Sequence, residues 1–236
     1  MRSGTFFVKM PKFVCMGLVY LRKLNKDTRF AIWRIEEEAD DLLSRLQLDE
    51  RERGVLRSLN KGKRTLHWLG TRVLLRYMLD TPGFIDCPSD ENGKPYLANF
   101  PQKISLTHSF DYVAVMLSEN GEVGIDLELV KPKITRIAHK FMKPEELEFM
   151  EGLEAESRID HLYACWCAKE AVYKLQGNRG VSFKDNMTIH PFVFQEQGVL
   201  ALTLVKPQEN GTESLTTYKV HYERFLDYML GYVMEP

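Results

Sequence analysis

The chain has 236 residues, of which 44% are hydrophobic and 28% are charged, and its formal net charge at pH 7 is −1. This composition predicts a packed core, with room for one large domain or two small lobes. The balanced charge gives no overall attraction to nucleic acid or to an anionic membrane. No apolar run approaches the roughly 18 residues of a membrane span. We therefore expect a cytoplasmic protein that binds neither nucleic acid nor membrane.

Residues 1–15 are expected to form an extension without regular structure, because the first strand pattern begins near Gly17. Their apolar stretch is interrupted by charged residues and proline, and it lacks the continuous hydrophobic region and cleavage site of a signal peptide. The four cysteines match no zinc-site spacing, so free thiols in a cytoplasmic protein are expected. They are Cys15, Cys87, Cys165 and Cys167.

The first half of the chain mixes strand and helix patterns. Strands are expected at 16–24 and 28–33, a helix at 36–46, and one or two helices over 49–79 with a break near Asn60-Lys61-Gly62. A loop rich in Pro, Gly and Asp follows over 79–95. Short strands return at 104–107, 112–118 and 123–130. Asn120-Gly121 between the last two predicts an antiparallel hairpin, because both residues tolerate positive φ.

The second half repeats this mixture. Helices are expected at 134–141, 144–151 and 156–175, and strands at 187–194, 199–205, 215–222 and 228–233. Helices followed by strands thus occur twice, which predicts an α+β fold of two similar lobes. We place the N-terminal lobe at 16–121 and the C-terminal lobe at 122–236. A cleft between two lobes is a common ligand site.

The predicted strand 123–130 carries acids on one face. Val123, Ile125 and Leu127 alternate with Gly124, Asp126 and Glu128. The two carboxylates lie roughly 6.6 Å apart along a strand, a spacing at which both can bind one hard cation. Glu122 shares this face, but it lies about 13 Å from Asp126 and is interpreted as an ordinary turn residue. Alone, the pattern indicates a divalent metal site.

The predicted helix 156–175 adds a third acid. Leu162, Trp166, Glu170 and Lys174 are spaced by four and share a face. The pair Glu170 and Lys174 can be an ordinary surface ion pair. Alternatively, Glu170 is a third carboxylate for the same cation, and the lysines of this helix bind an anionic substrate.

Two further motifs precede the acidic strand. Gly93-Lys94-Pro95 is a turn that presents a lysine, and Thr107-His108-Ser109 ends a short strand. Lys94 can be a plain turn lysine, and His108 can be a hydrogen-bonded structural histidine. A basic run over 51–76 is more often a solvated helix face, although part of it could bind phosphate through bidentate arginine contacts.

Together these motifs resemble a known family. Gly-x-Asp-x-Glu at 124–128 and Trp-x-x-Lys-Glu-x-x-x-Lys at 166–174 are similar to the 4′-phosphopantetheinyl transferase superfamily, of the type that activates surfactin synthetase. Gly93-Lys94-Pro95 and Leu106-Thr107-His108-Ser109 match its two upstream motifs in the same order. The first Ser of the usual Ser-His-Ser is Thr107 here, which keeps the hydroxyl. The resemblance covers 93–174.

The resemblance implies a fold with two lobes related by a pseudo-twofold axis, each with antiparallel strands packed on a long helix and with the active site in the cleft. It implies transfer of phosphopantetheine from coenzyme A to a serine of an apo acyl, polyketide or peptidyl carrier protein, with release of adenosine 3′,5′-bisphosphate. Mg²⁺, or Mn²⁺, would be held by Asp126, Glu128 and Glu170. Because both half-sites lie in one chain, a monomer is expected.

The resemblance also assigns roles in the transfer. Lys174 and Lys169 would stabilise the pyrophosphate, and Lys94, Thr107 and His108 would contact the donor. Arg64 and Arg72 are the candidates for the 3′-phosphate. Glu170 would take the serine proton, either directly or through a metal-bound water. The carrier surface is expected near Lys131-Pro132-Lys133 and residues 136–142.

Two other functions stay open at this point. One is a catalytically silent module that binds coenzyme A or a carrier protein. Its signature would be the loss of one acid or of Lys174, and all of them are present. The other is a nucleic-acid-binding module that uses the basic run, against which the balanced charge weighs.

Overall fold

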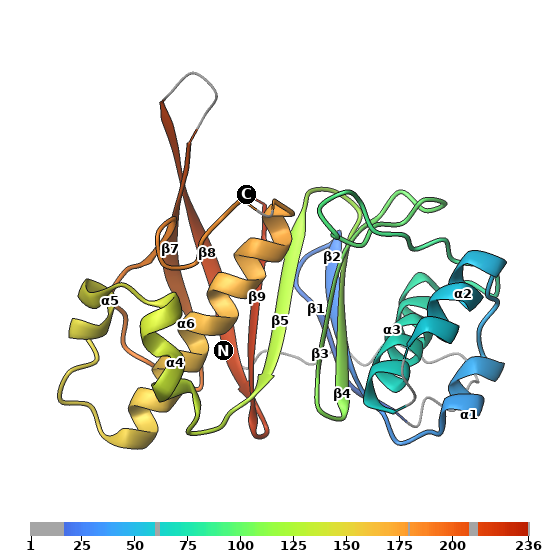
Figure 1. Cartoon of the computed structure of the whole chain (residues 1–236), viewed down its shortest axis with the longest axis horizontal. Coiled ribbons are helices and arrows are strands. Elements are labelled where there is room, and N and C mark those ends of the chain that lie inside the picture. The colour runs from blue at the N-terminus through green and yellow to red at the C-terminus, as the bar shows by residue number, and fades with distance from the viewer. Residues whose placement is uncertain (1–16, 60–61, 179, 208–211, 236) are drawn as a thin grey trace.

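The computed structural model describes residues 17–59, 62–178, 180–207 and 212–235. It is an α+β structure with two antiparallel sheets, each covered by helices on one side (Figure 1). The expectation for residues 1–15 lies outside the described residues. No helix in the described ranges is long and apolar enough to cross a membrane.

The first sheet has the strand order β1-β2-β4-β3 and packs on a long helix, α3. Leu69, Leu74 and Leu75 of this helix are buried in one cluster with Val113 and Val115 of β4. The elements are β1 (Leu18–Lys23), β2 (Thr28–Arg34), α1 (Ala39–Ser44), α2 (Glu50–Ser58), α3 (Lys63–Leu79), β3 (Lys103–Ser109) and β4 (Tyr112–Ser118). The predicted break between two helices is confirmed, because α2 and α3 are separate.

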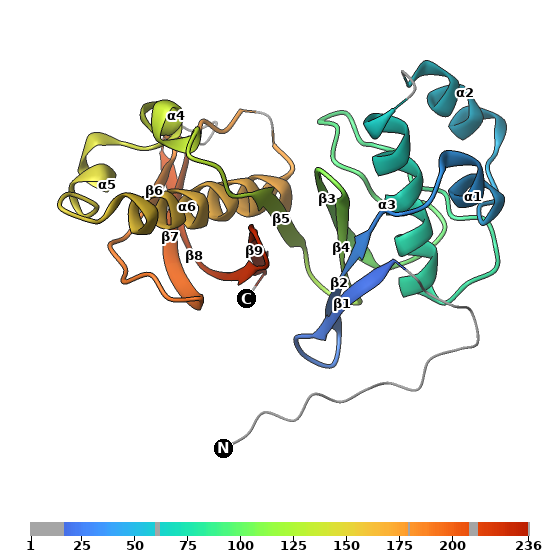
Figure 2. The same cartoon turned by 90° about the horizontal axis from the view of Figure 1, so that it is seen from below.

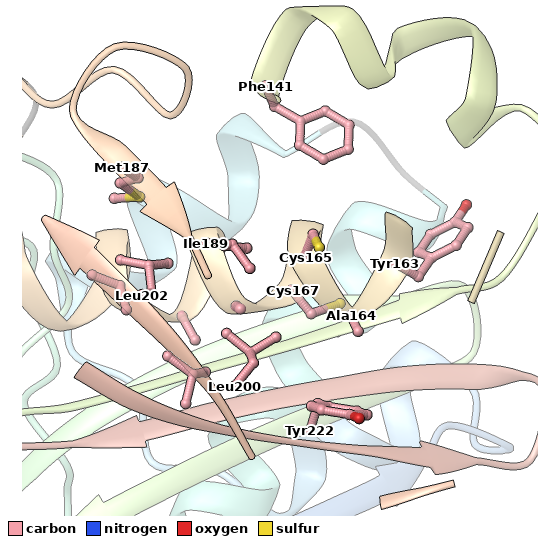
Figure 3. Close-up of a cluster of buried hydrophobic side chains, with 14 of the residues drawn as sticks. Phe141, Tyr163, Ala164, Cys165, Cys167, Met187, Ile189, Leu200, Leu202 and Tyr222 are labelled. Atoms are coloured by element: carbon pink, nitrogen blue, oxygen red, sulfur yellow. The ribbon is translucent and has the colours of Figure 1, made fainter. Parts of the chain in front are cut away.

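The second sheet has the strand order β5-β9-β8-β7-β6 and packs on α6. Figure 3 shows this core, in which Cys165 and Cys167 of the helix lie among buried side chains of the sheet such as Leu200 and Leu202. The elements are β5 (Val123–Leu129), α4 (Ile134–Phe141), α5 (Pro144–Glu148), α6 (Ala155–Gln176), β6 (Met187–Ile189), β7 (Gln197–Pro207), β8 (Glu213–Phe225) and β9 (Tyr228–Met234). Figure 1 shows that β7 and β8 form a long projecting hairpin.

The two sheets also pack on each other, so that they lie between α3 on one side and α6 on the other (Figure 2). A buried cluster joins Phe30 and Ile32 of β2 to Ile125 of β5 and Leu230 of β9. Each inner strand therefore has two apolar neighbours: the partner sheet on one face and its own helix on the other.

The predicted hairpin at Asn120-Gly121 is wrong. Gly121 has a positive φ of 80° as expected, but the chain passes there from one sheet to the other. The reason is that both edges of β4 are already paired, one with β2 and one with β3. β5 pairs instead with β9 from the end of the chain.

Other local predictions are adjusted by the structure. The strand expected at 187–194 ends at Ile189, because Pro191 has no backbone N–H to extend a ladder. Cys87, Cys165 and Cys167 are buried and form no disulfide among the described residues.

Candidate active site

The acidic strand β5 alternates as its sequence predicts. Val123, Ile125 and Leu127 are fully buried in the cluster between the sheets. Asp126 and Glu128 project from the opposite face, on which α6 packs. Asp126 is only 4% exposed, so its carboxylate lies within the structure rather than in solvent. The strand thus holds two acids beneath a helix.

Two glycines let the helix come this close. A Cβ at Gly124 would overlap the carbonyl group of Ala171 on α6. Gly231 of β9 pairs with Asp126 across the sheet, and a Cβ there would lie 2.8 Å from the Cys167 backbone. The close approach of α6 therefore depends on missing side chains in two neighbouring strands. Gly231 is not evident from sequence because its pairing with Asp126 appears only in the folded sheet.

α6 brings Lys174 onto Asp126. The Lys174 ammonium donates hydrogen bonds to Asp126 Oδ1 at 2.7 Å and to the Ile125 carbonyl at 3.1 Å. Glu170 lies one helical turn earlier on the same face. Helix and strand were predicted to form one site, and the structure brings these residues together.

Hydroxyl groups of β3 contact both acids. Thr107 Oγ1 donates to Asp126 Oδ1 at 3.1 Å, and Ser109 Oγ donates to Glu128 Oε2 at 3.2 Å. Thr107 is a predicted site residue, whereas the contact of Ser109 with Glu128 was missed. The available signal was the alternation of hydroxyl residues in β3, which matches the alternation of acids in β5. The first sheet thus supplies direct contacts to both carboxylates of β5.

The acids of this cluster shift one another's pKa because they lie close together. Burial, together with the negative charge of Asp126, raises the pKa of Glu170 to about 7. The same two causes raise the pKa of Glu128 above its ordinary value. Burial lowers the pKa of Lys174, but the carboxylates of Asp126 and Glu170 outweigh it and raise that pKa overall. The cluster therefore has an excess of negative charge for a cation to neutralise.

The fit to a divalent cation can be tested on the side chains. Among the described residues, no group of three or more His, Cys, Asp or Glu side chains is already arranged to hold a metal ion. Asp126 Oδ2, however, is buried and has no hydrogen-bond partner, an uncommon state for a carboxylate oxygen. Carboxylates are the donors that Mg²⁺ and Mn²⁺ prefer. The donor set and the free oxygen fit such an ion, with Lys174 beside it.

Lys94 has a different neighbourhood from the acids. Its ammonium contacts Glu122 Oε2 at 2.5 Å and the Leu175 carbonyl at 2.7 Å, and its aliphatic chain lies beside Gly177 at the end of α6. Glu122 is also paired with Lys103 at 3.1 Å. Glu122 is thus more than an ordinary turn residue: it joins two lysines of the first half to the second.

Two adjoining pockets border this contact. One has a volume of about 680 Å³ and is lined by residues that include Tyr96, Phe100 and Lys206. The other has a volume of about 190 Å³ and is lined by residues that include Tyr173 and Lys174. Lys94 lines both. Residues from both halves of the chain therefore form the walls, and the smaller pocket reaches the cluster of acids through Lys174.

His108 lies beside these groups with a partner that the sequence did not reveal. Its ring stacks on that of His67 from α3, with centroids 4.3 Å apart and an angle of 17° between the planes. Burial, followed by the proximity of His67, lowers the pKa of His108. A neutral ring in this position can accept or donate a hydrogen bond, but it adds no fixed positive charge.

The structure corrects two of the predicted basic residues. Lys169 is 0% exposed, and its ammonium donates to Glu146 at 2.8 Å and to three backbone carbonyls. It is therefore a structural cross-link that cannot reach a ligand. Arg72 pairs with the buried Glu52 at 3.2 Å and lies 3.5 Å from the centre of the Trp68 ring. Both charges are already paired within the protein, Lys169 in the core and Arg72 at a partly exposed position of α3. Arg64 is exposed.

The part of the chain that contains the acids is similar to known proteins. Residues 122–231 match the family model of the 4′-phosphopantetheinyl transferase superfamily. The 4′-phosphopantetheinyl transferase AcpT of Salmonella typhimurium is 34% identical over 121 residues, which are 50% of this chain and 62% of that protein. The 4′-phosphopantetheinyl transferase of Bacillus subtilis is 31% identical over 113 residues, 48% of this chain and 49% of that protein.

A Synechocystis protein with a provisional 4′-phosphopantetheinyl transferase name is 35% identical over 127 residues, 51% of each chain. The chain thus spans about half to three fifths of the length of these relatives. The family match begins at the turn before β5 and ends at Gly231, so it includes the acids, α6 and the glycine opposite Asp126. Over these residues the chain is similar to the 4′-phosphopantetheinyl transferase superfamily.

Proposed function

We propose that this chain transfers the 4′-phosphopantetheine group of coenzyme A to a serine hydroxyl of an apo carrier protein. The observation that carries the proposal is the contact of Lys174 with Asp126 beneath α6, with Glu170 and Glu128 around it. Phosphoryl transfer needs positive charge at the pyrophosphate and a base at the nucleophile. The side chains of this cluster can supply both.

The proposal assigns the donor to the pockets between the two halves. The smaller one opens beside Lys174 and the larger one beside Lys94 and Lys206, so lysines line the space that an anionic nucleotide would occupy. Arg64, exposed at the start of α3, is retained as the candidate for the 3′-phosphate. His108 and Thr107 would contact the donor from β3. We extend the proposal to the fold, which would consist of two lobes related by a pseudo-twofold axis. The enzyme would be of the type that activates surfactin synthetase, and it would act as a monomer.

The reaction then follows from the residues present. The serine oxygen forms a bond to the β-phosphorus of coenzyme A while the bond from that phosphorus to the bridging oxygen breaks, releasing adenosine 3′,5′-bisphosphate. Glu170 would take the serine proton. Its pKa of about 7 makes it a stronger base than a carboxylate with an ordinary pKa. Lys174 would stabilise charge on the phosphate oxygens.

Asp126, Glu128 and Glu170 would hold a Mg²⁺ or Mn²⁺ ion in the proposed enzyme. When bound, this ion neutralises the negative charge that develops on the pyrophosphate oxygens. Asp126 Oδ2 is the oxygen available for it. Asp126 Oδ1 is already engaged by Thr107 and Lys174, which would keep the carboxylate in one orientation. The chain's own contribution is therefore an Asp126 carboxylate with one oxygen engaged and one available, beside the carboxylates of Glu128 and Glu170.

The proposed carrier surface lies just after β5. The solvent side of α4 carries basic residues: Lys133 at its N-cap, and Arg136 and Lys140 within the helix. Ile134 and Ala138 of the same helix are buried. Carrier proteins of this superfamily are expected to be acidic, so a basic helix next to Glu128 suits such a partner.

The decisive experiment is mass spectrometry of purified apo acyl and peptidyl carrier proteins incubated with the chain, coenzyme A and Mg²⁺. We expect a gain of one phosphopantetheine mass for the wild-type chain and none for Asp126→Asn or Glu170→Gln. Glu156→Gln is the matched control, since Glu156 is an exposed acid on the same helix. Binding of coenzyme A or carrier without a mass gain would favour the silent binding module instead.

A further inference from the structure

β3 and β5 are edge strands of different sheets, and side chains join them. Ser105, Thr107 and Ser109 stand at every second position of β3. Their hydroxyl oxygens accept hydrogen bonds from the backbone N–H groups two residues apart on β5, at Ile125 (3.0 Å), Leu127 (3.3 Å) and Leu129 (3.1 Å). Each hydroxyl pairs with the residue 20 positions later, so the two strands run in the same direction. We call these three residues the hydroxyl ladder.

Two members of the hydroxyl ladder make a second contact. Each donates its proton to the side chain 19 positions later: Thr107 to Asp126 and Ser109 to Glu128. The corresponding position for Ser105 is Gly124, which has no side chain. The alternation Ser-x-Thr-x-Ser in β3 therefore matches Gly-x-Asp-x-Glu in β5 residue by residue. Ser105 supports only the backbone of β5, whereas the other two hydroxyls also hold a carboxylate.

The two acids depend differently on this support. Asp126 Oδ1 receives hydrogen bonds from both Thr107 and Lys174, so its orientation has two determinants. Glu128 receives its hydrogen bond from Ser109, and it is only half buried. Loss of the Ser109 hydroxyl therefore frees the Glu128 side chain, while loss of Thr107 leaves Asp126 held by Lys174. Ligating carboxylates generally need such a supporting hydrogen bond to bind metal well.

We propose that Ser109 is a positioning residue that fixes the Glu128 carboxylate for a divalent cation, and that Ser105 only sets the register of β5 against β3. The proposal rests on the proposed function for the identity of the ion. It assigns a metal-site role to the first sheet, which lies outside the matched region 122–231. Both sheets then build the cation site, because the ligands come from one and their orientation from the other.

The test is Mn²⁺ affinity, measured by electron paramagnetic resonance titration in the presence of coenzyme A, together with urea unfolding. Ser109→Ala is expected to weaken Mn²⁺ binding about 10- to 100-fold, the usual effect of removing a supporting hydrogen bond. Ser109→Thr is expected to bind Mn²⁺ like the wild type, because Thr107 already makes both kinds of contact at the neighbouring position. If Ser109→Ala does not fold, Ser109→Cys, with similar volume and a weaker donor, replaces it.

Ser105→Ala is the matched control, since it removes the same backbone contact without touching an acid. It is expected to lower the urea midpoint while Mn²⁺ affinity stays at the wild-type value. In a Glu128→Gln background, Ser109→Ala is expected to cause no further loss of affinity.

Three results would overturn the proposal: no Mn²⁺ binding by the wild-type chain, unchanged affinity in Ser109→Ala, or equal losses in Ser105→Ala and Ser109→Ala. The transfer assay on carrier proteins is read separately. Wild-type chain that binds Mn²⁺ with the expected dependence on Ser109, yet modifies no carrier, would contradict the proposed function and leave the positioning role standing.

Discussion

The Lys174 ammonium lies 2.7 Å from Oδ1 of Asp126, while Oδ2 of the same carboxylate is buried without a hydrogen-bond partner. One oxygen of Asp126 thus binds the Lys174 ammonium, and the other is available to a ligand. In the proposed enzyme the lysine and a divalent ion would share this carboxylate. Because both are positive, the presence of either one would weaken binding of the other to the site.

Lys174→Met separates the effect of the lysine on transfer from its effect on metal binding. Transfer is expected to fall about 10²- to 10³-fold, the usual cost of losing a donor to the developing charge. Affinity for Mn²⁺ without coenzyme A is expected to rise at least about tenfold. A unit charge and a doubly charged ion about 5 Å apart repel by about 7 kcal/mol at an effective dielectric constant near 20, and solvent screens much of this repulsion. Isothermal titration and the carrier assay measure the two quantities. Lys174→Arg, which keeps the charge, should show no gain in Mn²⁺ affinity; weaker binding in Lys174→Met would contradict the shared-carboxylate model.

Arg64 gives a prediction on donor recognition. If this exposed arginine binds the 3′-phosphate, Arg64→Ala removes a charge-assisted hydrogen bond of about 1.5–3 kcal/mol. The KM for coenzyme A should then rise about 10- to 100-fold, whereas the KM for 3′-dephospho-coenzyme A should not change. Steady-state kinetics with both donors measure this difference.

The matched control for Arg64 is Arg57→Ala, an exposed arginine on α2 that pairs with Glu50. It should leave both KM values as they are. Equal weakening of the two donors in Arg64→Ala would remove Arg64 from the 3′-phosphate site.

The buried pair of Lys169 and Glu146 predicts a stability effect rather than a binding effect. Lys169→Met leaves Glu146 charged and without its partner in the core, which generally costs about 3–5 kcal/mol. The free energy of unfolding in urea should fall by that order, and Lys169→Met/Glu146→Gln should recover part of it. The KM for coenzyme A of the folded enzyme should stay near the wild-type value.

Lys140→Met, at an exposed position of α4, is the control for Lys169 and should change stability by less than about 0.5 kcal/mol. A Lys169→Met variant as stable as the wild type, but with a raised KM for coenzyme A, would restore the ligand-binding role that the sequence motif suggested.

Local patterns predicted much of the site. The alternation along β5 identified Asp126 and Glu128, and the four-residue spacing on α6 identified Glu170 and Lys174, because periodicity determines which face a side chain occupies. The structure confirms that these elements meet. Lys169 illustrates the limit of such reasoning: a lysine next to Glu170 in sequence points about 100° around the helix, and only the packing of α5 shows that this direction leads into the core.

Strand pairing was less predictable. Asn120-Gly121 has the local form of a hairpin, but pairing depends on which strand edges are free, and β4 has none. The partner of β5 is β9, about a hundred residues later, and no local signal identifies it. For the same reason the pairing of Gly231 with Asp126 could not be predicted. The alternation of hydroxyl residues in β3 matches the alternation of acids in β5, but it does not by itself place the two strands side by side.

Gly124 tests whether the close packing of α6 on β5 matters. A methyl group at this position would overlap the Ala171 carbonyl, and backbone cannot move aside as a flexible side chain can. Gly124→Ala should therefore destabilise the fold by about 1–3 kcal/mol or more. It should also displace α6 relative to Asp126, so that Mn²⁺ affinity falls together with transfer. Urea unfolding and Mn²⁺ titration measure the two effects.

At a second glycine, Gly54, substitution by alanine is expected to stabilise the fold instead of destabilising it. Gly54 lies within α2, where a Cβ would meet only the end of the Arg57 side chain at 3.9 Å. Alanine there should stabilise the fold by about 0.5–1 kcal/mol, because it restricts the unfolded chain and favours the helix. A Gly124→Ala variant that matched the wild type in stability and in Mn²⁺ affinity would show that α6 can retreat without loss. The spacing of Glu170 and Lys174 over Asp126 would then not be set by the missing side chain at this position.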